Sequence, residues 1–233
     1  MKKYLILFIS IISLLTSGCK LLGNYQDSNS TLDVNELALL HMEKKYGEKF
    51  TYAAPSGNSM TGTREFLTFC ESLPGKTVVA QIENYKTDTP IYKDNYLEVL
   101  YEKDTISYFK KVADEVFGEN IVHYEVSNLS VSSNLSKDTS FKSFYEDPST
   151  FIVVYVEVKE SEYNSNKQFE EFFTRLNSSN GSIMVSVIVV KDSMYGTLEL
   201  DDLKLLPYKE QDIASIYGET INGRFQYELP KER

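Results

Sequence analysis

The sequence predicts an α+β fold, with an antiparallel sheet flanked by helices in the first half and a strand–helix–strand unit in the second half. Two segments of the first half, 32–46 and 104–117, carry apolar residues at helical spacing. Short runs rich in β-branched and aromatic residues lie between them. In the second half, two β-branched runs, 151–159 and 182–191, flank a segment with a helical pattern. Helices segregated from antiparallel strands are typical of the α+β class.

The first helix is predicted from Leu32 to Tyr46. Asp33 and Glu36 have the spacing of a capping box, in which two side chains bond the free backbone N–H groups of the first turn. Gly47 is typical of the residue that follows a helix end. Local signals therefore define both ends of this helix.

Four strands are predicted after the first helix, and turn residues separate them. They are the segments 50–53, 65–72, 77–84 and 95–101. The second helix, 104–117, ends before Gly118. This order indicates an antiparallel meander with helices on one face of its sheet.

The strand–helix–strand unit is predicted from residue 151 to residue 191. Its two runs, 151–159 and 182–191, are composed almost entirely of residues that favour buried strands. Between them, Ser165 and Gln168 form a second capping box ahead of a phenylalanine-rich helix. If both strands belong to one sheet, they are parallel and their connection is right-handed.

Three shorter elements complete the prediction. Residues 121–126 form a strand, 210–217 a short helix, and 224–229 a final edge strand.

The first 19 residues have the arrangement of an export signal. Two lysines precede a 12-residue stretch, 4–15, that is apolar except for two serines, and small residues lead to Cys19. A membrane-crossing helix needs about 20 apolar residues to span a hydrocarbon core of roughly 30 Å, so this stretch is too short. The alternative is an ordinary leader that is cut elsewhere.

The sequence after the leader divides into a linker and two subdomains. We expect residues 1–18 to be removed and 19–31 to form a polar linker that begins with a lipidated Cys19. Residues 32–123 then form an α+β subdomain, and 124–233 form a second subdomain of α/β type.

Composition excludes some partners. The chain has 34 acidic against 24 basic residues, which gives a net charge of −10 at pH 7. Attraction to phosphate needs clustered Lys and Arg, so a nucleic-acid partner is not expected.

The side chains that support hydrolytic or metal chemistry are scarce. The chain has two histidines, and Cys70 is its only cysteine besides Cys19. Cys70 lies in a strand-like run and is expected in the core. The segment 57–61 fails the G-x-S-x-G pattern, since Thr61 occupies its last position. We therefore predict no catalytic residue, no metal site and no cofactor, although paired carboxylates leave no local signature.

Two segments are candidate binding sites. The polar loop 55–64 contributes Asn58 and Arg64, because loops on a rigid scaffold often carry binding residues. Tyr92 and Tyr96 belong to a tyrosine-rich segment, and tyrosine supplies amphipathic contact area at interfaces. The alternatives are an ordinary hairpin connection for the loop and half-buried strand faces for the tyrosines.

The chain resembles the small lipoproteins of low-GC Gram-positive bacteria. The resemblance rests on the leader with Gly18 and Cys19, and on the segments 43–50, 94–97 and 117–118. Thr16 stands where the lipoprotein motif usually has Leu. The resemblance implies a diacylglycerol group joined to Cys19 by a thioether bond. With its two acyl chains buried in the bilayer, this group would be a stable anchor. It implies no specific activity.

These observations predict a lipid-anchored protein on the extracytoplasmic face of the cell membrane. We expect it to act as a non-catalytic binding or assembly module with a protein or cell-envelope partner. The alternative is a cell-envelope hydrolase that uses paired carboxylates, which would need two carboxyl groups about 5–10 Å apart in a deep cleft. A shallow apolar or tyrosine-rich surface favours the binding module. A solute receptor ranks last, because the 215 residues after the leader are few for two closing lobes.

Overall fold

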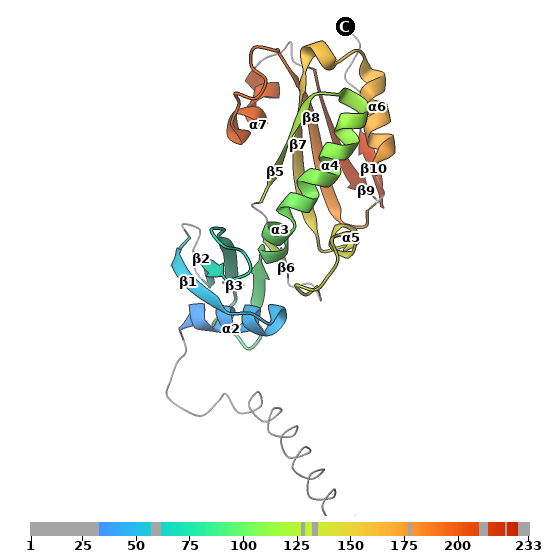
Figure 1. The fold of residues 1–233 in the computed structure, drawn as a ribbon. Helices are drawn as coiled ribbons and strands as arrows, with labels where there is room; N and C mark the ends of the chain where they lie inside the picture. The colour runs from blue at the N-terminus through green and yellow to red at the C-terminus, as the bar shows by residue number, and fades with distance from the viewer. Residues whose placement is uncertain are drawn as a thin grey trace, which may run out of the picture. The chain divides into compact units, whose positions relative to one another are not determined.

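The computed structural model describes residues 33–56, 62–126, 129–131, 135–176, 179–209, 214–221 and 223–227 (Figure 1). The helices are α2 (Val34–Tyr46), α3 (Tyr96–Leu100), α4 (Glu102–Phe117), α5 (Phe141–Glu146), α6 (Asn166–Arg175) and α7 (Leu200–Lys209), with a 3-10 turn at Glu160–Glu162. The strands are β1 (Phe50–Pro55), β2 (Thr63–Cys70), β3 (Val78–Glu83), β4 (Ile91–Asp94), β5 (Asn120–Glu125), β6 (Ser130–Val131), β7 (Phe151–Lys159), β8 (Ser182–Val190), β9 (Ser215–Ile221) and β10 (Arg224–Tyr227).

The first five-stranded sheet, sheet A, has the strand order β1-β2-β3-β4-β6, and each neighbouring pair is antiparallel. Alternate residues of β3 are buried: Val78, Ala80 and Ile82 point into the core, as expected for a sheet with one covered face. Helix α2 contacts β1, β2 and β3 and buries Ala38, Met42 and Tyr46. The predicted antiparallel sheet is confirmed.

The second sheet, sheet B, has the order β10-β9-β8-β7-β5. Strands β7 and β8 are parallel, and the other pairs are antiparallel. The predicted strand–helix–strand unit is therefore confirmed as β7-α6-β8. The Gln168 side chain accepts from the backbone N–H groups of Asn164 (2.6 Å) and Ser165 (3.4 Å) at the start of α6.

Helices cover the two faces of sheet B unequally. One face buries Val154, Val156 and Val158 together with the phenylalanines of α6. On the other face, Leu203 and Leu206 of α7 cluster with buried residues of β8. Figure 1 shows α4 and α6 against the sheet and α7 apart from them. Part of the α7 face, toward β9 and β10, keeps exposed side chains.

Two predicted elements are wrong. The strand predicted at 95–101 is the short helix α3, because Asp94 Oδ1 accepts the N–H of Tyr96 (3.1 Å) and four successive residues of α3 are buried, which an alternating strand does not allow. The helix predicted at 210–217 is contradicted at 215–217, which belong to β9, and residues 210–213 lie outside the described residues. The helix of this region is α7, at 200–209.

The predicted subdomain boundary between residues 123 and 124 falls inside β5, which pairs with β7 along its whole length. The two sheets group the chain differently: β1 to β4 and β6 form sheet A, whereas β5 and β7 to β10 form sheet B. Residues 34–233 form one unit. The division into two subdomains stays a prediction.

Among the described helices, none combines the length and the apolar character that crossing a membrane requires. The residues predicted to be the leader and the linker, 1–31, lie outside the described residues.

Candidate functional site

A hairpin of β9 and β10 forms the end of sheet B, and its residues build the candidate site. Strand β9 ends at Ile221 and β10 begins at Arg224, and the register pairs these two residues. Gly223 has a φ of +77°, a conformation that glycine adopts without strain. The dipeptide Asn222-Gly223 is the strongest short-range sequence signal for such a tight hairpin.

The residues of β9 alternate between a buried face and an exposed face. Ile216 and Gly218 are buried beside α6, whereas Tyr217 and Ile221 point outward and are 43% and 37% exposed. Gly218 is required by close packing, because a Cβ atom there would lie 2.4 Å from Cε1 of Phe173. Phe173 therefore lies directly on the backbone of β9 and holds the strand against α6.

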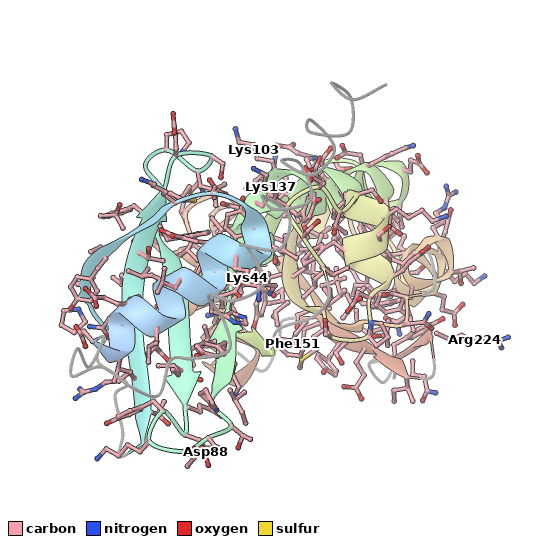
Figure 2. All side chains as sticks on the ribbon, turned by 90° about the horizontal axis from the view of Figure 1, so that it is seen from below. Lys44, Asp88, Lys103, Lys137, Phe151 and Arg224 are labelled. Atoms are coloured by element: carbon pink, nitrogen blue, oxygen red, sulfur yellow. The ribbon has the colours of Figure 1, made fainter. Side chains whose placement is uncertain are left out.

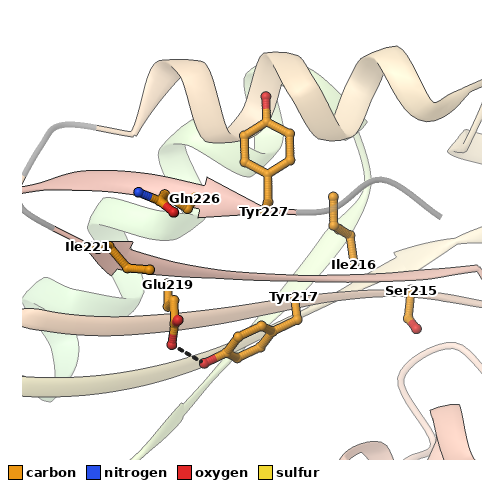
Figure 3. A pocket seen from close by; sticks show the side chains of 7 residues that line it. All are labelled: Ser215, Ile216, Tyr217, Glu219, Ile221, Gln226 and Tyr227. Atoms are coloured by element: carbon orange, nitrogen blue, oxygen red, sulfur yellow. Dashed lines mark hydrogen bonds between the residues drawn. The ribbon is translucent and has the colours of Figure 1, made fainter.

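An open hollow of about 570 Å³ lies at this hairpin, and the outward residues Tyr217, Glu219 and Ile221 belong to its lining (Figure 3). Its lining residues come from both strands of the hairpin: Ser215, Ile216, Tyr217, Glu219, Ile221, Gln226 and Tyr227. In Figure 3, Tyr217 and Glu219 point to one side of the strands and Tyr227 points to the other. This volume lies within the range of small-molecule and side-chain sites, roughly 300–1,000 Å³.

Two polar groups of the hollow form a hydrogen-bonded pair. The Tyr217 hydroxyl donates to Oε2 of Glu219 at 2.9 Å. Partial burial and this hydrogen bond raise the pKa of Tyr217 to about 12. The phenol is therefore protonated at neutral pH, and Glu219 is the one carboxylate among the residues that line the hollow.

A second, smaller hollow lies between α6 and β10. Its volume is about 270 Å³, and it is lined by Phe173, Thr174, Leu176, Arg224, Phe225 and Tyr227. The rings of Phe173 and Tyr227 are stacked, with their centroids 4.8 Å apart. Strand β10 therefore contributes residues to both hollows, and three of the six residues that line the second one are aromatic.

The structure brings two of the predicted binding residues into one row of sheet A. Arg64 on β2 pairs with Ile82, and Ile82 pairs with Tyr92 on β4, so the two side chains lie on the same face two strands apart. Arg64 is exposed, and the half-buried Tyr92 ring stacks on His41 with centroids 4.1 Å apart. Asn58 and Cys19, which the sequence also indicated as site residues, lie outside the described residues.

Tyr96 occupies the core instead of a surface. Its side chain has no exposed area, and its ring contacts Tyr46 and Phe50. Its hydroxyl donates to Glu48 and lies 3.1 Å from the hydroxyl of Ser72. Burial and the bond to Glu48 raise the pKa of Tyr96, which keeps this phenol neutral.

Buried carboxylates occur in both sheets, each next to a basic or polar group. In sheet A, Asp94 accepts from the Tyr46 hydroxyl at 2.6 Å and lies 3.2 Å from Nζ of Lys45. In sheet B, the fully buried Glu157 lies 3.3 Å from Nε2 of His123 and accepts the N–H of Gly196 at 2.8 Å. These contacts are those expected of buried charges that are held by partners.

Metal-ligating side chains and the Cys70 thiol do not build a second site in the described part of the chain. Within the described ranges, no group of three or more His, Cys, Asp or Glu side chains is placed to hold a metal ion. Cys70 is half-buried at the end of β2, and burial raises the pKa of its thiol. Its neighbour is the hydroxyl of Ser72, 3.6 Å from the sulfur.

Sequence reasoning missed the β9–β10 site because 210–217 was predicted as a helix. One signal could have found it: the Asn222-Gly223 dipeptide favours a tight hairpin that ends in the edge strand predicted at 224–229. The packing of Phe173 on Gly218 joins residues 45 positions apart and leaves no local signal.

Comparisons with known proteins give a structural likeness and no sequence match. No family model matches the chain, and no curated protein matches its sequence. The chain is similar to the crystal structure of a DUF5037 family protein from Ruminococcus gnavus, with a TM-score of 0.42 and 11% sequence identity. The likeness covers 83% of this chain and 94% of the other.

Proposed function

We propose that this protein is anchored by lipid to the extracytoplasmic face of the cell membrane and binds a partner with the β9–β10 end of sheet B. The observation that carries the proposal is the open hollow of about 570 Å³, which presents Tyr217, Glu219 and Ile221 on one exposed face. The lipid anchor is inferred from the leader and Cys19.

The residues of this hollow suit recognition. Exposed aromatic and aliphatic side chains beside a fixed hydrogen-bonding pair are typical of binding surfaces. The hairpin is held by Phe173 against Gly218, so the surface is ordered before a partner arrives. Binding by a preformed surface avoids the entropy loss of ordering it.

The chemistry of the hollow favours binding over hydrolysis by paired carboxylates. Glycoside cleavage by that mechanism needs an acid and a second carboxylate on opposite sides of one bond. Among the residues that line the hollow, Glu219 supplies a carboxylate and Tyr217 supplies a hydrogen bond to it. This arrangement supports a partner surface.

A site-specific crosslink in the membrane-tethered protein tests the proposal. A photoreactive phenylalanine analogue replaces Tyr217 in one variant and Tyr52 on β1 in a control. The two tyrosines are matched in exposure, at 43% and 41%. We expect a discrete adduct from position 217. Excess wild-type protein should suppress this adduct, whereas excess Tyr217→Ser/Ile221→Ser double variant should not.

Two results would contradict the proposed site. One is an equal yield of adducts from positions 217 and 52, which would indicate contact without recognition. The other is an adduct at position 217 that the double-variant competitor suppresses as efficiently as the wild-type protein does.

A further inference from the structure

The backbone of β10 has one hydrogen-bonded side and one outward side. In the strand order of sheet B, β10 is the end strand and its partner among the described strands is β9. In a hairpin of this length, the paired residues that flank the turn, Ile221 and Arg224, form a hydrogen-bonded pair. Hydrogen-bonded and non-hydrogen-bonded pairs alternate along antiparallel strands, so Glu219 and Gln226 form the next hydrogen-bonded pair. The N–H and C=O groups of Phe225 and Tyr227 therefore point away from β9.

The edge at β10 has part of the usual protection of an exposed strand, because it is four residues long and carries one charged residue, Arg224. Its described residues include no lysine and no proline, and its pairing with β9 has no bulge. The sequence of β10 is Arg-Phe-Gln-Tyr, and its register with β9 is regular. The outward backbone groups of Phe225 and Tyr227 are thus a template for one more strand.

The side chains around this edge would accept alternate residues of an added strand. On the α6 side, Phe173, Phe225 and Tyr227 line the aromatic hollow of about 270 Å³. On the other side, Glu219 lies toward the Gln226 end of β10. Arg224, at the beginning of β10, also lines the hollow of about 270 Å³. Figure 2 shows Arg224 projecting outward from the ribbon.

We propose that an extended peptide segment of a partner protein adds to β10 as an antiparallel strand. Its residues opposite Phe225 and Tyr227 are apolar, its residue opposite Gln226 is basic, and its residue opposite Arg224 is acidic. This inference rests on the proposed binding function and names the class of partner.

Strand geometry fixes the order of residues in the peptide. An antiparallel strand runs past Tyr227 first and past Arg224 last, so its sequence reads apolar, basic, apolar, acidic. A residue opposite Gln226 lies two strand spacings, roughly 10 Å, from the backbone of Glu219. The extended stem of Lys or Arg together with the Glu219 side chain spans that distance. Contacts of opposite charge then fix register and direction.

The test uses the fluorescent peptide Val-Lys-Phe-Glu-Val with blocked ends, titrated with the full chain purified from membranes in detergent. Two N-methylated versions of this peptide probe the backbone contacts. Methyl groups on the backbone nitrogens of its first valine and its phenylalanine remove donors that face β10 and are expected to weaken binding at least tenfold. Methyl groups on the backbone nitrogens of its lysine and its glutamate face away and leave the affinity within about twofold.

The charge contacts are tested with the reversed peptide Val-Glu-Phe-Lys-Val. We expect it to bind about fivefold more weakly, the size of two exposed ion pairs. The double variant Glu219→Lys/Arg224→Glu is expected to prefer the reversed peptide. Because only a folded protein can bind that peptide more tightly, this result also shows that the variant is folded. Asp88→Asn, at the exposed turn between β3 and β4, is the control and leaves both affinities unchanged.

Three outcomes overturn the proposal. Equal binding of the two methylated peptides excludes pairing with the outward groups of β10. An unchanged preference in the charge-reversed variant excludes the assigned contacts. A dimer of the protein that the peptide leaves intact shows that a second copy occupies the edge. If the peptide does not bind but the crosslink at position 217 still forms, the proposed binding function stands and the proposed strand addition is wrong.

Discussion

The hydroxyl group of Tyr46 holds a buried carboxylate. It donates to Oδ1 of Asp94 at 2.6 Å, and both side chains are nearly inaccessible to solvent. Lys45, at 3.2 Å, and the N–H of Tyr96, at 3.1 Å, also bind this carboxylate. Burial and the neighbouring Asp94 raise the pKa of Tyr46, so the phenol is a permanent donor.

Tyr46→Phe is expected to lower the free energy of unfolding by about 1–3 kcal/mol, because a buried charged acceptor loses a hydrogen bond. Urea denaturation of the purified protein measures the change. The control is Tyr52→Phe, which alters a hydroxyl on a 41% exposed side chain and should change stability by less than about 0.5 kcal/mol. Equal losses in the two variants would contradict the role assigned to Asp94.

His41 makes stability depend on pH. Burial lowers its pKa below the ordinary value of 6.5, the neighbouring Lys45 and Lys44 lower it further, and Asp94 opposes them. Within the described residues, no hydrogen-bond partner reaches Nε2 of His41, and its ring stacks on Tyr92. The folded protein therefore favours the neutral ring.

The sign of this dependence follows from the lowered pKa. Below pH 6.5 the unfolded chain binds a proton at His41 that the folded protein resists, so stability falls as pH drops through this value toward the folded pKa. His41→Phe retains a flat ring against Tyr92 and removes the titration. Unfolding measured at pH 7.5, 6.5 and 5.5 should show a weaker decline in the variant. An identical slope would exclude His41 as its source.

At the scale of elements, the contact between α6 and β9 decides the geometry of the candidate site. Gly218 admits the ring of Phe173 at a distance that no Cβ atom tolerates. The same ring stacks on Tyr227 and contacts Phe225, so one side chain of α6 packs on both strands of the hairpin. The position of β10 therefore depends on α6 and not on the hairpin turn alone.

Gly218→Ala should destabilise the protein by about 1–3 kcal/mol, because an inserted methyl group forces a packed element to shift. Phe173→Leu frees part of that space. The double variant should therefore lose less free energy of unfolding than the two single variants lose in sum. Thermal unfolding of the wild type, the two single variants and the double variant measures this difference. Additive losses would show that the two residues do not contact each other as the structure indicates.

The elements differ in how far local sequence predicted them. Helix α4 carries a long helical pattern, and β7 and β8 are long β-branched runs; all three were predicted within two residues at each end. Segment 95–101 is largely apolar, and such a run is compatible with a strand or a buried helix. The Asp94 side chain, which accepts the N–H of Tyr96, decided in favour of the helix.

At the scale of the whole molecule, charge and the leader set the expected location. A net charge of −10 gives no attraction to anionic lipid, so membrane attachment would have to come from acyl chains on Cys19. In this proposal, the polar segment 20–31 is the tether between the anchor and the folded part.

Cys19→Ala is expected to move the protein from the membrane fraction to the soluble fraction, because two acyl chains supply the anchoring energy. Ultracentrifugation measures the distribution, and mass spectrometry of the first mature peptide identifies the lipid. Cys70→Ser is the matched control, since it alters the other thiol and should leave the protein on the membrane. Retention of Cys19→Ala would contradict the anchor.

The sequence by itself determined the α+β class, the parallel β7-α6-β8 unit and the helices α2, α4 and α6, because apolar periodicity and capping residues act within one element. Only the tertiary structure decided which predicted binding residues are accessible: Tyr96 is in the core, while Arg64 is exposed. It also decided that β9 and β10 form the open end of sheet B. That surface exists because Phe173 packs on Gly218, and contacts between residues distant in sequence leave no local pattern to read.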